Sequence, residues 1–467
     1  MKRRIAVFLD ADIKKETFSF DELVIRTKEV FDKNGMPAVI TLILEWMDGD
    51  LCDSLTGVQT KESLASINVK PCCKTPYFVR SSREPRRIDS TIGKIKFHWM
   101  RLKCKNCKES FIPLRQFLNV KLYTSHTLEL EKIACETASH QSYRRSAKHM
   151  TDIGGNPLGK SKIHTWVQKT DSAHLKLEQK ELVTIVADGT GYPRFKTNAQ
   201  KEDEKKNPKR DADNRPLEQI RVILGIDKHG KTIPMGVFNE EKWNEIGRLV
   251  KRANHHPKLK SKPIAELLVS DGELAIERGL GKLAKTQQRC QWHLTYDLKS
   301  VMKYQDEANN EETRKVKDQL HEIMRIPLPN EPRDKVKTEE ILNLEVSVFN
   351  AERQMNALVK DLKEKQYFQT ATYVENAKAK LFNYVRVWIR TGDAPPKVSS
   401  IIERMMREIK LRLKRIGCNW SPKGAAQMTK IILKRFTNSN EWEKYWSDTL
   451  KLDGKMKIEF AGAQFVN

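Results

Sequence analysis

The chain has 467 residues, of which 39% are hydrophobic and 31% are charged, and it carries a formal net charge of +25. Its length exceeds what one ordinary hydrophobic core can organise, so we expect two to four domains. No apolar run approaches the about 20 residues of a membrane span, and the apolar stretch near the N-terminus is too short for a signal peptide, so we expect a cytosolic protein. The positive charge is spread over every segment, which predicts a polyanionic partner such as nucleic acid rather than a merely basic surface.

Hydrophobic periodicity divides the chain into six predicted regions. In chain order we expect a mainly helical region (residues 1–65), a small β unit (66–120), a helix-turn-helix module (121–175), the first part of an α/β core (176–300), a helical insertion (301–395), and the last helices of the core with a tail (396–467). The predicted class is therefore α/β with a mostly helical insertion.

The β unit carries four of the eight cysteines. The stretch RRIDSTIGKIKFHWMRLKCKNC (86–107) alternates polar and apolar residues, and Gly93 marks a turn, which predicts two strands. Cys104 and Cys107 form a Cys-x-x-Cys motif, and Cys72 and Cys73 lie upstream. A metal held by four soft ligands between two loops of a small β unit is typical of a zinc ribbon.

The adjacent pair Cys72 and Cys73 departs from the usual ribbon, which uses a spaced pair. Neighbouring side chains point in diverging directions, so we expect strain if both bind one ion. His98 is an alternative ligand. The further alternative is that the cysteines are reduced thiols that pack a small core, since disulfides are rare in the cytosol.

Residues 127–168 have the layout of a helix-turn-helix unit. One helix is predicted over 127–139, a second after Gln141, and a third after a turn rich in glycine and proline. Near the start of the third helix the side chains would meet bases and phosphates, while Ile163, Trp166 and Val167 would pack inward. The expected DNA contacts here are Arg144, Arg145, Lys160, Ser161, Lys162 and His164. The alternative is an ordinary three-helix bundle.

Two apolar, β-branched runs in the α/β core each end in an aspartate, Asp188 in TIVADGTG and Asp271 in ELLVSDGE. Two such strands side by side would hold two carboxylates close together at the edge of a sheet. Oxygen ligands suit hard divalent cations such as magnesium, and two such ions can promote phosphoryl transfer. The alternative is that each Asp-Gly pair is a plain turn.

A third carboxylate is expected from the helix that follows the proline-rich break at 391–400. Glu403 lies in its first turns, with Glu408 as a rival and Glu273 as a weaker one. An apolar stripe would pack this helix on the sheet. The remaining positions are strongly basic and suit a phosphate backbone, and we expect contacts with DNA from Arg404, Arg407, Lys414 and Arg415.

The stretch RCQWH (289–293) contains Cys290 and His293, spaced like half of a zinc site. No second pair of ligands lies nearby in the sequence to complete one. The residues alone leave open whether the two side chains serve a site or fill the core beside Trp292.

Four motifs, VADGTG, LLVSDGE, QRCQWH and SSIIERMMREIKLRLKRIG, occur in that order and together resemble the catalytic segments of Mutator-superfamily transposases from prokaryotic insertion sequences. A long helical insertion before the last motif also matches, as do NWSPKGAAQM and the hairpin 86–107. The resemblance covers roughly residues 85–430. It implies an RNase H-like core and a DDE-type enzyme that cleaves the ends of a mobile element and joins them to target DNA.

The resemblance implies a role for each motif. Asp188, Asp271 and Glu403 would bind Mg²⁺ or Mn²⁺, and Cys290 and His293, which match a Cys/Asp-x-x-His signature, would support the active site. The implied partner is double-stranded DNA, bound by a homodimer or a larger oligomer at the nucleoid in the cytoplasm. The alternatives are a non-catalytic DNA-binding regulator derived from a transposase, and a nuclease or resolvase of the same fold.

Overall fold

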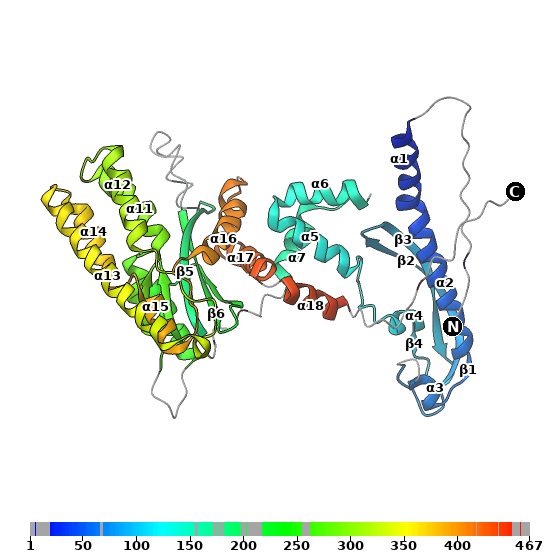
Figure 1. The fold of residues 1–467 in the computed structure, drawn as a ribbon. Coiled ribbons are helices and arrows are strands. Elements are labelled where there is room, and N and C mark those ends of the chain that lie inside the picture. The colour runs from blue at the N-terminus through cyan, green and yellow to red at the C-terminus, as the bar shows by residue number, and fades with distance from the viewer. Residues whose placement is uncertain are drawn as a thin grey trace. The chain divides into compact units, whose positions relative to one another are not determined.

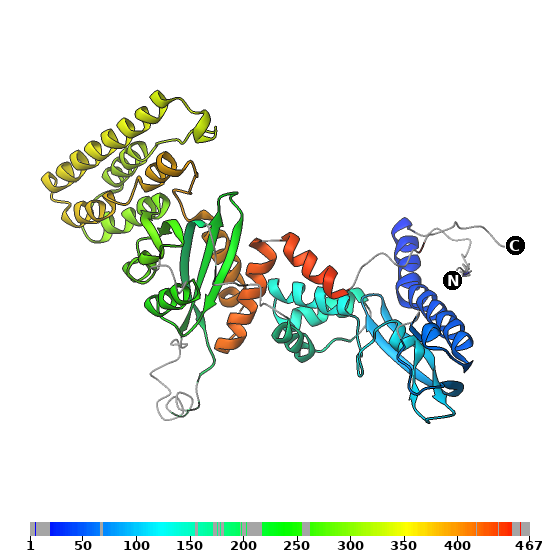
Figure 2. The ribbon, with the colours of Figure 1, turned by 90° about the horizontal axis from the view of Figure 1, so that it is seen from below.

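The computed structural model describes residues 19–65, 69–154, 157–170, 182–196, 217–254, 262–416, 418–437 and 439–450, with single positions 5, 175, 178, 198, 202 and 458. These residues form two compact units, drawn in Figures 1 and 2. The first contains the described residues up to Val167 and those from Tyr445 onward, and the second contains those between Gln168 and Lys444. Among the described residues, no helix combines the length and apolar content that a membrane span requires.

The first unit begins with helices and a small antiparallel sheet. Its strands follow the order β1-β2-β3-β4. The elements are α1 (Phe20–Val30), a π-helical turn (Phe31–Gly35), α2 (Met36–Leu55), β1 (Gly57–Val58), α3 (Lys61–Ala65), β2 (Tyr77–Ser90), β3 (Gly93–Cys104), β4 (Ser110–Phe111) and α4 (Pro113–Phe117). The predicted hairpin is confirmed, since β2 and β3 pair from Ser90–Gly93 to Phe78–Cys104 and Gly93 turns with φ 112°.

Helix α2 and the hairpin share one hydrophobic core. Leu51 of α2 is buried against Ile95, Phe97 and Trp99 of β3. The backbone N–H of Met100 also donates to Asp48 of α2 at 2.8 Å. The boundary expected between residues 65 and 66 therefore runs through a common core, because the helix covers one face of the sheet.

Three helices follow in the first unit: α5 (Leu128–His140), α6 (Tyr143–Gly154) and α7 (Lys160–Lys169). They confirm the predicted helical segments. The side chain of Thr127 caps α5 by accepting from the N–H of Leu130 at 3.3 Å. Ile163, Trp166 and Val167 are buried, as their spacing predicts. Near the hairpin turn, Asp89 exchanges backbone hydrogen bonds with Ser125 and Thr127 and so ties the helices to β2.

The second unit is built on a five-stranded mixed sheet with the order β7-β6-β5-β8-β9. The strands are β5 (Leu182–Pro193), β6 (Leu217–Asp227), β7 (Thr232–Phe238), β8 (Ala265–Ser270) and β9 (Ala284–Arg289). Strands β5, β6 and β7 are antiparallel neighbours, while β8 runs parallel to both β5 and β9. Strand β9 (AKTQQR) was not predicted, because its polar residues lack the alternation that marks a strand.

Helices cover both faces of the sheet. Ile185 and Ala187 of β5 belong to a core with Ile246 of α9 (Trp243–Ala253) and Ile276 of α10 (Leu274–Leu280). Asp188 follows Ala187 and so points to the other face, because successive side chains of a strand alternate. That face of β5 meets α16 (Ser400–Lys410). The backbone continues from α16 as a π-helical segment (Leu411–Arg415).

The predicted helical insertion lies between β9 and α16. It comprises α11 (Gln291–Tyr304), α12 (Asn310–Ile323), a short 3₁₀ turn (Arg333–Lys335), α13 (Thr338–Glu364), α14 (Phe368–Lys378) and α15 (Asn383–Thr391). After α16 come α17 (Pro422–Thr437), which packs on β7, and α18 (Ser439–Leu450). Ser421 caps α17 as predicted, since its hydroxyl accepts from the N–H of Gly424 at 3.1 Å.

Candidate functional site

The sheet order brings Asp188, within β5, next to Asp271, which follows β8. In the parallel pair β5–β8, Val186 lies opposite Val269, and each aspartate follows its valine by two residues. Asp271 directly follows the carboxyl end of β8, whereas Asp188 lies within β5, which continues to Pro193 in its pairing with β6. The strand end predicted at Asp188 is therefore wrong, but the register still places the two aspartates next to each other on neighbouring strands. The sequence predicted that the two strands lie side by side and bring these two carboxylates close together.

Asp188 sits in a confined and charged environment. Its pKa is raised from 3.8 to about 6, mainly by burial and also by the charge of Asp271, although the charges of Lys410 and His293 and the hydrogen bond from Gly189 oppose the rise. Its Oδ1 accepts from the N–H of Gly189 at 2.6 Å. Asp271, His293 and Lys410 therefore lie near enough to Asp188 for their charges to act on it.

The turn that carries Asp271 requires a glycine. Gly272 has φ 93°, and a Cβ at this position would lie 1.9 Å from a guanidinium nitrogen of Arg289. Asp271 itself accepts from the N–H of Glu273 at 2.8 Å. The buried Arg289 side chain donates to the hydroxyl of Tyr373 at 2.8 Å and so fixes the base of the turn.

Cys290 and His293 occupy the start of α11, beside the end of β8. The N–H of Cys290 donates to the carbonyl of Ser270 at 2.8 Å, which places α11 directly behind the Asp271 turn. Burial opposes protonation of His293, but its hydrogen bond with Cys290 and the charges of Cys290, Glu403 and Asp271 raise its pKa above the ordinary value. His293 therefore faces the acidic groups.

Ser399 joins the third expected carboxylate to this pair. Its Oγ lies 2.6 Å from Oε1 of Glu403, 3.2 Å from Sγ of Cys290 and 3.3 Å from Nδ1 of His293. A hydroxyl has one proton to donate. The carboxylate oxygen of Glu403 is both the nearest and the strongest of the three acceptors, so Ser399 donates to Glu403. Glu403 Oε1 is also 3.6 Å from Nδ1 of His293.

Ligand atoms of Cys290, His293 and Glu403 lie within 4.8 Å of one another. The hydroxyl of Ser399 is within hydrogen-bonding distance of all three, so a hydrogen-bonded network describes this cluster better than an ion site. Within the described part of the chain, Asp188, Asp271 and Glu403 do not form such a tight group. The structure thus places the three acids around one region without showing a preformed magnesium cage.

The two rival carboxylates differ in their surroundings. Glu273, two residues after Asp271, has a pKa raised by burial and then by the charge of Asp271. It therefore stays within reach of the site. Glu408 lies five residues after Glu403, which turns it well away from Glu403 around the axis of α16.

Basic side chains surround the acidic region. Lys410, on α16, lowers the pKa of Asp188 by its charge. The expected DNA contacts Arg404, Arg407, Lys414 and Arg415 are all exposed. Arg412 is instead buried, with its guanidinium 4.6 Å from the ring centroid of Trp420.

The expected contacts in the three-helix module are also mostly exposed. They include Arg144 and Arg145 on α6, and Lys160, Ser161 and His164 on α7. Lys162 is half-buried, because its ammonium pairs with Asp89 at 3.5 Å and lies over the ring of Trp166. Its availability for phosphate is therefore lower than the sequence suggests.

The four cysteines of the β unit converge. The Sγ atoms of Cys72, Cys73, Cys104 and Cys107 lie within 4.8 Å of one another. The strain expected from the adjacent pair does not keep these two thiols apart, because both belong to a bend that faces the Cys-x-x-Cys loop. Hydrogen bonds from the backbone hold the pKa of Cys104 at about 6 although burial opposes this. Such a cluster is compatible with structural zinc.

Two contacts fix the loops that carry these cysteines. The amide of Asn106 donates to the carbonyl of Thr75 at 2.5 Å and so links one loop to the other. Lys108 adopts φ 65° and donates from its N–H to the carbonyl of Cys104 at 3.0 Å. His98 is exposed and pairs across the hairpin with Pro85, so it does not belong to the cluster and is not a substitute ligand.

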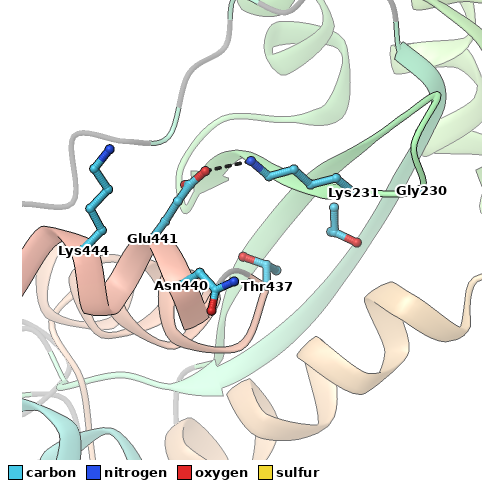
Figure 3. Close-up of a pocket in the computed structure, with 7 residues that line it drawn as sticks. Gly230, Lys231, Thr437, Asn440, Glu441 and Lys444 are labelled. Atoms are coloured by element: carbon cyan, nitrogen blue, oxygen red, sulfur yellow. Dashed lines mark hydrogen bonds and ion pairs between the residues drawn. The ribbon is translucent and has the colours of Figure 1, made fainter.

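A pocket lies elsewhere on the second unit and is drawn in Figure 3. The turn between β6 and β7 forms one wall, and the end of α17 with the start of α18 forms the other. Lys231 and Glu441 pair across it at 2.9 Å. The pocket contains none of the acidic residues expected at the site.

Sequence reasoning missed Ser399. Ser399 precedes Glu403 by four residues, which is one helical turn, and this spacing was the available signal. A comparison of the chain with known protein families finds no match, and a comparison with curated proteins finds none either. The function must therefore be inferred from the arrangement of the protein's own side chains.

Proposed function

We propose that the protein is a DDE-type DNA transposase with an RNase H-like core. The observation that carries this proposal is the register Val186–Val269, which sets Asp188 and Asp271 side by side. Three antiparallel strands followed by two parallel ones is the order that an RNase H-like core requires. Glu403, the third acid of the motif, reaches the same region from α16 through its contact with His293.

The carboxylates of Asp188, Asp271 and Glu403 are suitable ligands for a hard divalent cation, and we propose Mg²⁺ or Mn²⁺. Burial and the charge of Asp271 raise the pKa of Asp188, so the two carboxylates repel in a confined space. A cation with oxygen ligands relieves that repulsion. When bound, it would activate the attacking oxygen and stabilise the leaving oxygen in phosphoryl transfer.

The protein's own groups orient the acids and neutralise the phosphate. Ser399 fixes one carboxylate oxygen of Glu403, and His293 faces that same oxygen. Lys410 adds positive charge beside Asp188. Cleavage at the ends of a mobile element and joining to target DNA are both in-line displacements, so positioning and charge carry the catalysis.

The first unit would supply DNA binding. Exposed basic side chains on α6 and α7 suit a phosphate backbone, and α7 would enter the major groove of double-stranded DNA. The cysteine cluster would hold a structural Zn²⁺. Two element ends must be held together, so we propose a homodimer or a larger oligomer on DNA, in the cytoplasm of a prokaryotic cell.

A cleavage and strand-transfer assay with Mg²⁺ or Mn²⁺ tests this function. Asp188→Ala, Asp271→Ala and Glu403→Ala should each abolish cleavage and joining, while binding to duplex DNA changes less than about threefold. Full activity of the Asp188→Ala variant would refute the proposal. Cleavage without joining would identify a nuclease or resolvase, and DNA binding without cleavage would identify a regulator.

Glu408→Ala is the matched control for the third acid, since it lies on the same helix. It should retain most of the activity. If Glu408→Ala is inactive and Glu403→Ala is active, the third ligand is Glu408. Glu273→Ala tests the remaining rival in the same way.

A further inference from the structure

Helix α11, labelled in Figure 1, carries two large aromatic side chains that are exposed to solvent near His293. Trp292 is 44% exposed and Tyr296 is 63% exposed. Their rings stack with centroids 4.8 Å apart and an interplanar angle of 14°. Side chains of this size are usually buried in a core, so an exposed stacked pair is a feature to be explained.

The same helical face continues with positive charge. Trp292, Tyr296, Lys299 and Lys303 follow one another at spacings of four, three and four residues, which places them in one stripe. Lys299 and Lys303 are exposed. The opposite face is apolar and packs inward through Leu294, Leu298 and Met302.

The stripe adjoins the candidate active site through His293. The ring of Trp292 meets the imidazole of His293 edge to face, with centroids 4.8 Å apart. His293 in turn faces Glu403 at 3.6 Å. A ligand that contacts Trp292 is therefore separated from Glu403 by the side chain of His293.

We propose that the outer face of α11 binds an unpaired nucleobase of the DNA strand at the active site. Flat, exposed rings match the π-face of a base that has left its duplex, whereas bases inside a duplex are already stacked. Lysines one and two turns further along would contact the phosphates that follow. The inference deepens the proposed transposase function and rests on it.

A simpler account is that the two rings only support the helix. Side-chain pairs four residues apart on a helix surface stabilise the helix modestly. That role needs no lysines on the same face and no position next to His293. The two accounts make different predictions for the removal of one ring: only the first predicts a selective loss of affinity for single-stranded DNA.

Binding of fluorescently labelled oligodeoxythymidylate, compared with a blunt duplex of the same length, tests the proposal in the full chain without added divalent cations. Trp292→Ala and Tyr296→Ala should each weaken single-strand binding roughly 5- to 100-fold. Duplex binding should change less than about twofold, and Trp292→Phe should keep most of the single-strand affinity. Phe349→Ala is the matched control, because Phe349 is 60% exposed on α13.

If both alanine variants keep the affinity for single-stranded DNA unchanged, the proposed base-binding face of α11 is wrong. An equal loss for single strand and duplex would overturn it as well, and a thermal melt shows whether the variant is folded. Because no cleavage is measured, these outcomes are distinct from the Asp188→Ala test of the proposed function.

Discussion

The two clusters of ligand-type side chains in this protein are organised in opposite ways. In the first unit, four cysteine sulfurs lie within 4.8 Å of one another, with loops tied together by Asn106. In the second unit, the three acids surround a region, and the tightest contacts are the hydrogen bonds of Ser399. A structural metal site is closed by its protein ligands, whereas a catalytic site keeps positions open for substrate. The contrast fits the two proposed roles, a structural zinc site in the first unit and a catalytic site in the second.

Removal of the cysteine cluster should have the largest effect. Cys104→Ser, or treatment with a zinc chelator, should abolish the thermal transition of the first unit, because metal binding in small zinc domains contributes on the order of 10 kcal/mol to folding. Elemental analysis of the purified protein should find about one zinc per chain. Cys52→Ala is the control, since Cys52 is buried in the same core outside the cluster and should leave the zinc content intact. A zinc-free, fully folded protein would contradict the assignment.

Neutralising Asp188 should stabilise the second unit. The pKa of Asp188 is about 6 in the folded protein against an ordinary 3.8, so its ionised form is disfavoured by folding. This cost is absent below pH about 4, grows between pH 4 and 6, and is complete above pH 6. In the absence of added divalent cations, Asp188→Asn should therefore raise the free energy of unfolding by about 2 kcal/mol at pH 8 and by little at pH 4. Urea titrations at the two pH values measure this, and an equal effect at both would argue against the confined carboxylate.

The hydrogen bonds of Ser399 should contribute less. Ser399→Ala removes the donor to Glu403, which we expect to cost about 1–2 kcal/mol in the free energy of unfolding, as for other hydrogen bonds to charged groups. It should also raise the Mn²⁺ concentration needed for half-maximal cleavage about tenfold, because the Glu403 carboxylate loses its orientation. Ser400→Ala, at the exposed neighbouring position, is the control. If both variants behave alike, Ser399 does not orient Glu403.

Much of the local structure could be predicted because local signals agree. Alternation and Gly93 predicted the hairpin, and the caps Thr127 and Ser421 mark the starts of α5 and α17. Strand β9 escaped prediction because its own residues are mostly polar, and because its place at the edge of the sheet is set by pairing with β8 and by hydrogen bonds to the insertion. Local pattern cannot show such tertiary constraints.

The acidic residues were recognisable, whereas their mutual geometry was not. Apolar runs that end in an aspartate pointed to Asp188 and Asp271, although β5 continues past Asp188, and the adjacency of the two residues depends on the pairing of β5 with β8. Ser399 went unnoticed because its partners Cys290 and His293 lie more than a hundred residues away in the chain. The cysteine pair 72–73 was doubted on the geometry of neighbouring residues, and the bend that carries it removes that objection.

The helical insertion leaves the sheet and returns to it at almost the same point. The N–H of Gln291 donates to the carbonyl of Lys397 at 3.2 Å, and the N–H of Ser399 lies 3.3 Å from Sγ of Cys290. The five helices α11 to α15 are therefore connected to the sheet through two chain segments that contact each other directly. A connection of this kind tolerates changes in the length and sequence of the inserted segment, because the entropy cost of closing a loop grows slowly with its length. The insertion can therefore diverge and acquire new surfaces while the residues at its root keep their places.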